Sequence, residues 1–234
     1  MGERLDKFLA SQGLGTRKEV GKLIRSGAVL VNGAPQRDPG AKVEPGVDRV
    51  TAQGEEIRYQ EFLTIMLNKP AGVLSATEDR RQKTVLDLLP EGLRRRGLFP
   101  AGRLDKDTTG LLLITDDGEL AHKMLSPKSH VYKQYRAQLD APVEEADIQA
   151  FAAGVAWEGE QYAPARLWVE QDPRAAFVEI REGRFHQVKR MFQARGKTVL
   201  QLKRLKIGGL WLDSTLQEGE CRLLTPQEIQ AIFH

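Results

Sequence analysis

The chain has 234 residues, of which 41% are hydrophobic and 29% charged, with 22 Gly and 11 Pro. This composition is typical of globular proteins and excludes collagen-like, low-complexity and disordered chains. The net charge of +3, from 35 Lys and Arg against 32 Asp and Glu, does not by itself indicate a polyanionic partner. The length predicts one or two domains, and the single Cys221 excludes an intramolecular disulfide.

The first residues mix charged and apolar side chains, so they lack the continuous apolar core of a signal peptide. The longest apolar run, residues 111–114, is too short to cross a bilayer, which needs about 20 residues. We therefore expect a soluble cytoplasmic protein without a membrane partner.

Two helices are predicted at the N-terminus, over residues 4–12 and 17–25, because apolar residues recur there at helical spacing. Thr16 is placed to cap the second helix, and Glu19 three residues later completes a capping box. The pattern is that of a helix, a turn and a second helix.

Strands are predicted after these helices. Residues 29–31 enter a hairpin at Asn32-Gly33, and residues 43–50 are predicted to form another strand. Residues 52–61 are polar and contain Gly54, which favours a hinge between two modules.

Residues 1–59 contain the motifs Arg4-Leu5-Asp6-Lys7-Phe8-Leu9-Ala10, Thr16-Arg17-Lys18-Glu19 and Val31-Asn32-Gly33. From the residues alone, another kind of small interaction domain is equally possible, but these motifs resemble the alpha-L RNA-binding domain, also called S-four-like. In that family the helices and the following strand grip structured RNA. The resemblance therefore implies phosphate contacts for the basic residues of the second helix, which are Arg17, Lys18, Lys22 and Arg25.

The remaining residues, 62–234, alternate strand-like and helix-like segments without a fixed repeat. Strands are predicted over residues 62–67, 111–114, 134–139, 176–180 and 198–202, and helices over residues 85–89, 119–125, 144–152, 187–195 and after Thr225. Because helices do not regularly separate the strands, the predicted fold class is α+β. We expect a small N-terminal domain and a second domain with a mixed, mainly antiparallel sheet flanked by helices.

Positive charge is concentrated in residues 181–206, which contain nine basic residues and the single acid Glu182. This concentration predicts a surface that meets a polyanion, although ordinary solvated surface residues would give the same count. Aromatic residues such as Phe185 interleave with the charges, which favours RNA as the partner. Among the predicted RNA contacts in this segment are Arg184, Arg190 and Arg204.

Cofactor motifs are missing from the sequence. It has no phosphate-cradling loop, and its four histidines lack zinc-ligand spacing. Acidic and polar residues from Asp105 to Asp116 match several positions of a calcium loop, but the last ligand is not Glu and the flanking helices are missing. We therefore predict no metal and no nucleotide cofactor.

Residues 102–110 form the densest polar motif. Asp107, Asp116 and Asp117 are interpreted as turn residues around a buried strand. Asp105 differs, because the basic segment offers it cationic partners, and a carboxylate nucleophile or base needs such partners to stay ionised. The residues alone thus indicate an RNA-binding enzyme built around one carboxylate.

Five motifs follow one another in the second domain: residues 67–72, residues 102–112, Lys133-x-Tyr135, residues 183–191 and residues 202–209. They resemble, in the same order, those of pseudouridine synthases of the RsuA type, and together with the N-terminal module the resemblance covers essentially the whole chain. Such enzymes isomerise uridine within RNA without a cofactor. The bond between N1 and C1′ is broken, the uracil turns, and C5 is joined to C1′.

The resemblance implies roles for individual residues. Asp105 corresponds to the catalytic aspartate, which attacks C1′ or acts as a base toward the ribose. Tyr135 corresponds to the tyrosine that stacks on the uracil and takes the C5 proton, and Lys189 to the basic partner of the aspartate. Arg103 is expected to position the flipped nucleotide, and Leu202 to form the apolar pocket wall beneath the base. Without the motifs, Tyr135 could equally be a core aromatic and Lys189 a phosphate contact.

The expected substrate is 16S ribosomal RNA, free or in a small-subunit precursor particle. Residues 107–111, 115–118 and 126–127 resemble the small-subunit branch of the family more than its large-subunit branch. The alternatives are a synthase acting on 23S RNA of the large subunit and a non-catalytic ribosome-assembly factor that binds RNA. We expect the protein to act as a monomer.

Overall fold

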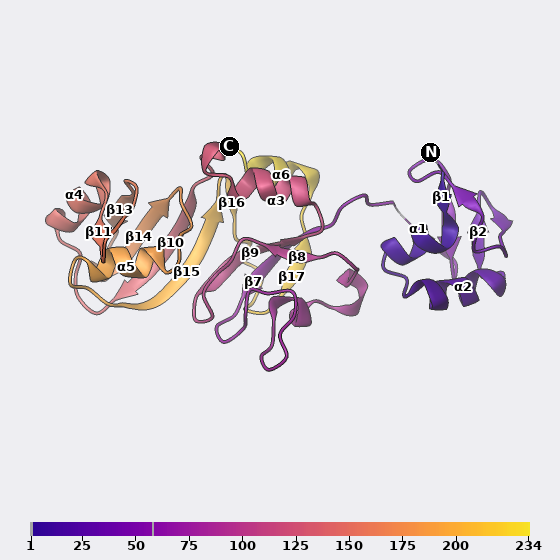
Figure 1. Cartoon of the computed structure of the whole chain (residues 1–234), viewed down its shortest axis with the longest axis horizontal. Coiled ribbons are helices and arrows are strands. Elements are labelled where there is room, and N and C mark those ends of the chain that lie inside the picture. The colour runs from indigo at the N-terminus through magenta and orange to yellow at the C-terminus, as the bar shows by residue number, and fades with distance from the viewer. Residues whose placement is uncertain (1, 58) are drawn as a thin grey trace. The chain divides into compact units, whose positions relative to one another are not determined.

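The computed structural model describes residues 2–57 and 59–234, and the chain divides into two compact units (Figure 1). The first consists of Met1–Leu63 and Leu89–Leu98, and the second of Thr64–Leu88 and Phe99–His234. Leu89–Leu98 includes Arg95, whose guanidinium donates hydrogen bonds to the carbonyls of Ser11, Gln60 and Glu61. The first unit therefore includes a segment, Leu89–Leu98, that the chain reaches only after entering the second unit.

Helices α1 (Leu5–Ser11) and α2 (Arg17–Arg25) form where the apolar spacing predicts them. The capping box of Thr16 and Glu19 is present at the start of α2, which confirms that prediction. The two helices share a core with the neighbouring strands. Its fully buried members include Leu5, Phe8, Leu9, Val20, Ile24 and Val29.

The sheet of the first unit has the order β3-β2-β5-β6, and a separate pair joins β1 to β4. Their bounds are β1 Glu3–Arg4, β2 Val29–Val31, β3 Ala34–Pro35, β4 Lys42–Val43, β5 Val50–Ala52 and β6 Glu55–Ile57. The predicted turn at Asn32-Gly33 is confirmed, and both residues have the positive φ that a tight hairpin turn requires.

Two sequence predictions for this unit are wrong. The strand predicted over residues 43–50 is interrupted after Val43, because the amides of Val47 and Asp48 bond to the Glu44 carbonyl in a turn. Residues 52–61 are not a simple hinge, because β5 and β6 pair as a hairpin around Gln53-Gly54. Residue 58 of that range lies outside the described residues.

The second unit is built on a nine-stranded sheet with the main order β13-β14-β10-β15-β9-β7-β17. Its strands are β7 Thr64–Lys69, β8 Phe99–Ala101, β9 Thr109–Thr115, β10 Lys133–Leu139, β13 Arg166–Val169, β14 Ala175–Ile180, β15 Val199–Ile207, β16 Leu210–Trp211 and β17 Cys221–Leu223. Within the described residues β9 and β15 run parallel, and the other neighbours in this sheet run antiparallel. The predicted α+β class with a mixed, mainly antiparallel sheet is confirmed.

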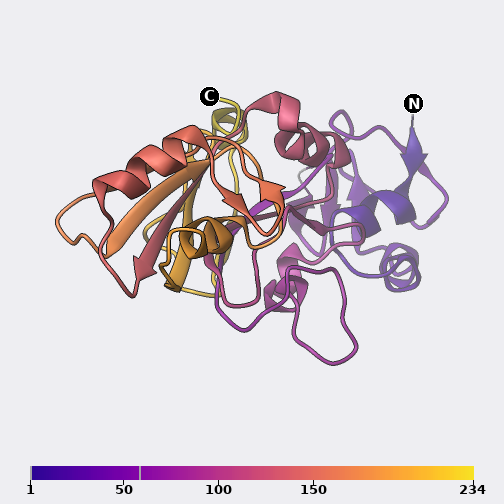
Figure 2. The ribbon, with the colours of Figure 1, turned by 60° about the vertical axis from the view of Figure 1, so that its left-hand side comes forward.

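Helices pack against two regions of this sheet. The helices are α3 Gly118–Leu125, α4 Glu145–Ala153, α5 Gln187–Gln193 and α6 Pro226–Ala231. The second unit also contains the 3-10 turns η1 Val85–Leu88 and η3 Pro127–Ser129 and a small hairpin of β11 Ala156–Trp157 and β12 Glu160–Gln161. A further 3-10 turn, η2 Glu91–Leu93, belongs to the first unit. Helices α3 and α6 share one core cluster (Figure 1). Helix α4 lies alongside β13 (Figure 2), and the rings of Phe151 and Phe192 join it to α5 at a centroid distance of 4.9 Å. The α-helix predicted over residues 85–89 is not formed, because Val85–Leu88 adopts only a 3-10 turn.

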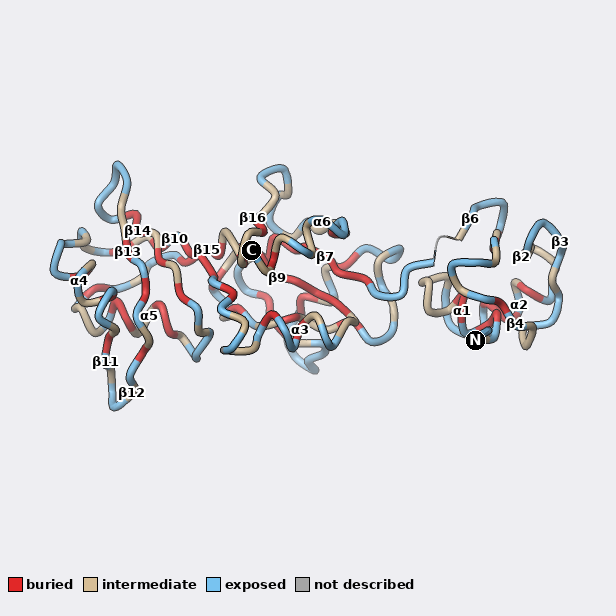
Figure 3. The backbone as a smooth tube through the Cα atoms, turned by 90° about the horizontal axis from the view of Figure 1, so that it is seen from above, coloured by how far each residue is buried: buried red, intermediate tan, exposed pale blue. Residues whose placement is uncertain are grey.

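The central strands β7 and β9 are buried along almost their whole length, as the red trace in Figure 3 shows. Because both faces are covered, β9 is a continuous apolar run in the sequence rather than an alternating one. The loop that precedes β9 emerges from this rigid centre and carries Asp105.

Gly110 allows the parallel strands β9 and β15 to approach closely. Its φ is +98°, and an added Cβ would overlap the backbone carbonyl oxygen of Arg204. We expect Gly110→Ala to lower the free energy of unfolding by about 2–4 kcal/mol, measured by urea denaturation.

Gly118→Ala is the matched control, because Gly118 begins α3 and an added Cβ there meets no atom within 4 Å. Its effect should stay within about 0.5 kcal/mol. Equal stability of the two variants would show that the close approach at Gly110 does not constrain the sheet.

Asp6 is a pH-sensitive contact in the first unit. Hydrogen bonds from Arg4, aided by Arg17, outweigh the opposing effect of burial and lower the pKa of Asp6 to about 2. Because this folded-state pKa is depressed, the contact stabilises the unit fully above about pH 4 and is lost as the pH falls towards 2. The stabilisation is roughly 1 kcal/mol, since both guanidiniums are half exposed and screened by solvent.

Amide hydrogen exchange in α1 of the full-length protein tests this contact. Asp6→Asn should lower the free energy of opening of the α1 amides by roughly 1 kcal/mol at pH 6 and by almost nothing near pH 2. The free energy of opening of the α3 amides should not change. A difference that stays the same at both pH values would contradict the assignment.

Candidate functional site

A pocket opens in the second unit where the loop before β9 meets the turn before α5. Strands β10, β14 and β15 supply its other wall. The lining residues are Arg103, Leu104, Asp105, Thr108, Tyr135, Ile180, Gly183, Arg184, His186, Gln187, Val188 and Leu202. Five of them, namely Arg103, Asp105, Tyr135, Arg184 and Leu202, are site residues predicted from the sequence.

The loop that carries Asp105 is fixed from below by buried polar contacts. The fully buried Lys69 ends β7, and its Nζ donates hydrogen bonds to the carbonyls of Pro70 (3.0 Å), Lys106 (3.2 Å) and Thr108 (2.9 Å). Burial lowers the pKa of this ammonium to about 8, and the charges of Asp107 and Asp105 oppose that shift. The Ser75 hydroxyl also bonds to both the amide and the carbonyl of Leu104.

Asp105 faces two side chains from the turn and first residues of α5. Lys189 Nζ lies 3.2 Å from Asp105 Oδ2, and His186 Nε2 lies 3.5 Å from Asp105 Oδ1. The side chains of Lys189 and Asp105 are 19% and 25% exposed, so the pair is sheltered but remains open to a ligand. The structure thus brings together the carboxylate and the basic residue that the family resemblance implies.

His186 is a site residue that the motifs did not single out, and it lines the pocket beside Asp105. It occupies the N-cap position of α5 with a φ of +53°, a left-handed conformation that non-glycine residues adopt infrequently. The relevant sequence signal is its spacing, because residues three apart, such as His186 and Lys189, lie on one side of a helical turn.

Asp107 is more than the turn residue that the sequence indicated. Its Oδ1 accepts a hydrogen bond of 2.6 Å from Lys189 Nζ, which lowers the pKa of the Asp107 carboxyl although the side chain is 75% exposed. Lys189 therefore bridges two carboxylates of one loop. The Asp-x-Asp spacing on a bent loop could have indicated this arrangement.

Tyr135 and Leu202 come from the neighbouring strands β10 and β15. In the antiparallel register Tyr135 is opposite Arg204 and Ala137 is opposite Leu202, so these four side chains leave the same face of the sheet. Both Tyr135 and Leu202 are 7% exposed and line the pocket. The apolar wall implied by the family resemblance is thus present.

Arg204 is not the surface RNA contact predicted from the sequence. It is 5% exposed, and its Nε donates a hydrogen bond of 2.7 Å to the Leu111 carbonyl within the sheet. The alternation of side chains along β15 turns Arg204 inward, while its neighbour Lys203 leaves the opposite face.

The remaining basic residues of segment 181–206 do not form one free surface. Glu160 pairs with both Arg184 and Arg190, and the buried Asp147 pairs with Arg195 and Lys197. Because these acids lie elsewhere in the sequence, charge counted along the segment overstates the exposed positive charge. Arg103 and Arg181 are exposed, and Arg103 and Arg184 reach the pocket.

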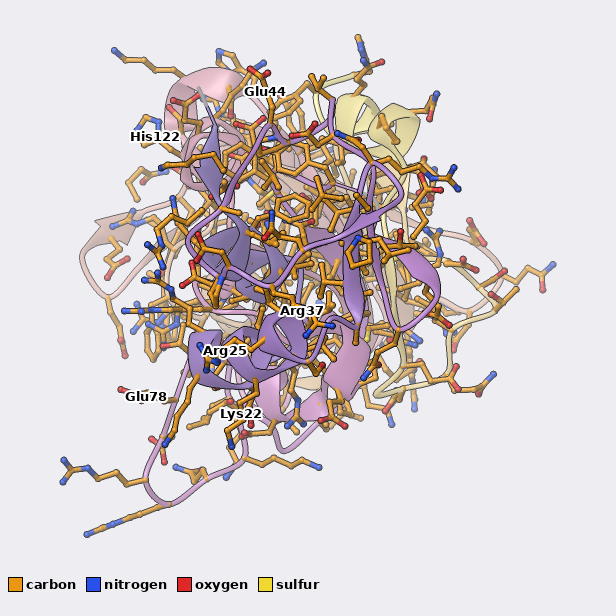
Figure 4. The ribbon with its side chains drawn as sticks, turned by 90° about the vertical axis from the view of Figure 1, so that its right-hand side faces the viewer. Lys22, Arg25, Arg37, Glu44, Glu78 and His122 are labelled. Carbon is orange, nitrogen blue, oxygen red and sulfur yellow. The ribbon has the colours of Figure 1, made fainter. Side chains whose placement is uncertain are left out.

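The four basic residues predicted to contact RNA from the first unit all lie on α2 and are exposed. Arg17 is held by Asp6 at 3.0 Å. Figure 4 shows Lys22 and Arg25 near Arg37, whose guanidinium lies beside Gly27 at the end of α2. Arg37 was not identified from the sequence, because it lies on a loop outside the helix pattern.

Neither metal ligation nor a membrane span is evident in the described part of the chain. Residues 2–57 and 59–234 contain no group of three or more His, Cys, Asp or Glu side chains arranged to hold a metal ion. None of their helices is long and apolar enough to cross a bilayer.

Comparison with known proteins agrees with these features. The RNA pseudouridylate synthase family matches residues 63–194, and the S4 domain matches residues 3–48. An uncharacterised RNA pseudouridine synthase of Bacillus subtilis (strain 168) is 46% identical over 233 residues, which cover 98% of each chain. The ribosomal small subunit pseudouridine synthase A of Escherichia coli (strain K12) is 42% identical over 232 residues, which cover 98% of this chain and 99% of the relative.

A solved structure of a pseudouridylate synthase is also similar. It is 39% identical, with a TM-score of 0.68, and the match covers 98% of this chain and 99% of the other. Together with the carboxylate pocket and the N-terminal S4 domain, these matches show that the chain belongs to the RNA pseudouridylate synthase family.

Proposed function

We propose that this RNA pseudouridine synthase converts a uridine of 16S ribosomal RNA, in the small ribosomal subunit, into pseudouridine. The observation that carries the catalytic part is the ion pair of Asp105 with Lys189 at the pocket, beside Tyr135. The substrate is supported by full-length relatives that are named for the small ribosomal subunit. The proposal places the protein in the cytoplasm, with free ribosomal RNA or a small-subunit precursor particle as its partner.

The target uridine has to leave its stack to enter the pocket. Extrusion of a base costs a few kcal/mol, which phosphate contacts made elsewhere on the protein can offset. The exposed basic residues of α2 and Arg103 at the pocket are the groups to which we assign these contacts.

Asp105 is assigned as the catalytic residue. Its carboxylate acts toward the ribose, by attack on C1′ or as a base, while the electron pair of the N1–C1′ bond leaves with the uracil. Lys189 holds the carboxylate in place by charge attraction, which is stronger in a sheltered pocket than in water. Because Lys189 also binds Asp107, it holds the loop at two carboxylates, Asp105 and Asp107.

The detached uracil then has to turn so that C5 meets C1′. Leu202 and Tyr135 provide an apolar and aromatic wall against which a planar base can rotate without losing contact. After the new C–C bond forms, C5 loses its proton, and we assign this step to Tyr135. Because the side chains of this scheme meet in one pocket within a single chain, we propose that a monomer acts alone, without a nucleotide cofactor.

Asp105→Asn tests the catalytic assignment. It retains the size of the side chain but removes its charge, so release of tritium from C5-labelled uridine in 16S RNA should fall by about 10³-fold or more. Asp172→Asn, at an exposed turn between β13 and β14, is the matched control and should react at the wild-type rate. Native-rate release by Asp105→Asn would overturn the assignment, and faster release from 23S RNA by the wild type would overturn the proposed substrate.

The role proposed for α2 is tested by replacing Lys22 and Arg25 together with Ala. Loss of two phosphate contacts should weaken binding to structured 16S RNA by roughly 10-fold and reduce the slope of log K against log salt by about 2. The control replaces Lys42 and Arg49, basic residues of the same unit outside α2, and should retain the wild-type slope. An unchanged slope in the α2 variant would contradict the role.

A further inference from the structure

Arg204 is a buried cation directly behind the pocket wall. It lies on β15 opposite Tyr135 on β10, so the two side chains occupy the same face of the sheet. Its Nη1 donates a hydrogen bond of 3.4 Å to Tyr135 Oη, and its guanidinium carbon lies 5.9 Å from the centre of the Tyr135 ring. Its Nε is anchored on the Leu111 carbonyl of β9, which fixes the guanidinium between three strands.

The positive charge of Arg204 is not neutralised locally. Within the described residues neither Arg204 nor its neighbour Lys133 forms an ion pair with a carboxylate, and Arg204 Nη2 is buried without a hydrogen-bond partner. Burial and the nearby Arg204 charge lower the pKa of Lys133 to about 8. Two cations are therefore buried on the neighbouring strands β10 and β15, and one of them, Arg204, donates to the hydroxyl of Tyr135.

Such an arrangement costs stability. A buried charge without a carboxylate partner is unfavourable, and a methionine would fill the space of the arginine's aliphatic stem without that cost. Packing alone therefore does not account for an arginine at this position. The group that benefits from it is the Tyr135 oxygen, which is the only side-chain acceptor that Arg204 contacts among the described residues.

The direction of the hydrogen bond determines what Tyr135 can do. A guanidinium only donates, so the phenol oxygen accepts from Arg204 and its own proton is free to point elsewhere. Because Tyr135 lines the pocket, that direction includes the space where a base would lie. A fixed positive charge beside the oxygen also favours any negative charge that develops on it during reaction.

We propose that Arg204 is a positioning residue that holds the Tyr135 hydroxyl at the pocket wall and keeps a fixed positive charge beside it. This inference rests on the proposed function, because it requires the Tyr135 hydroxyl to act on the uracil. It replaces the RNA contact predicted for Arg204 from the sequence and adds no chemical step to the reaction.

A double-mutant cycle tests the proposal in the full-length protein. Arg204→Met should lower the single-turnover rate of C5 tritium release by about 100-fold and leave the Kd for the RNA unchanged. In a Tyr135→Phe background the same substitution should change the rate by less than about twofold, because the hydroxyl through which Arg204 acts is already missing. Arg204→Lys, which retains the charge but loses the fork of donors, should recover part of the rate.

Arg136→Met is the matched control, since Arg136 neighbours Tyr135 on β10 but is exposed on the opposite face. It should react at the wild-type rate. Thermal denaturation monitors folding of every variant, and if Arg204→Met does not fold, the same cycle with Arg204→Lys decides. A wild-type rate for the folded Arg204 variant, or a loss that multiplies with that of Tyr135→Phe, would overturn the inference.

The cycle uses whichever ribosomal RNA the wild-type protein modifies. Preference of the wild type for 23S RNA would contradict the proposed substrate and leave the comparison between Arg204 and Tyr135 intact. Conversely, independent effects of the two substitutions would contradict the role of Arg204 and leave the substrate unaffected.

Discussion

The contact between Lys189 and the two carboxylates Asp105 and Asp107 is the interaction on which the site depends. It joins the loop before β9 to the first turn of α5, two segments that have no backbone hydrogen bond to each other among the described residues. Without it, the loop would still be held from beneath by Lys69, but the Asp105 carboxylate would lose the shorter of its two contacts with the start of α5, 3.2 Å to Lys189 against 3.5 Å to His186.

The second unit also buries the cations Lys69, Lys133 and Arg204, and each is accommodated differently. Lys69 is satisfied by three backbone carbonyls, so it acts as a clamp on the loop. Lys133 has one carbonyl partner, and Arg204 retains a buried Nη2 without a partner. Unsatisfied buried polarity is destabilising, and proteins tolerate it mainly at functional sites. Burial of the central strands β7 and β9 stabilises the sheet and offsets the cost of burying these cations (Figure 3).

The sequence predicted what depends on neighbouring residues and missed what depends on distant ones. The capping box of α2 and the Asn32-Gly33 turn are local patterns, and both were confirmed. The burial of Arg204 and the neutralisation of Arg190 by Glu160 arise from strand register and long-range packing, which charge counting along the chain does not capture. For the site, local chemistry indicated one carboxylate, whereas the partnership of Asp105 with Lys189 was implied only by the family resemblance.

The central claim is that this pocket modifies the RNA of the small ribosomal subunit through Asp105. Its most direct test is to map pseudouridine in 16S and 23S RNA from cells that lack the protein and from the same cells supplied with wild-type or Asp105→Asn protein. We predict that one 16S position loses its pseudouridine and regains it with the wild type alone. Loss confined to 23S RNA, or restoration by Asp105→Asn, would contradict the account.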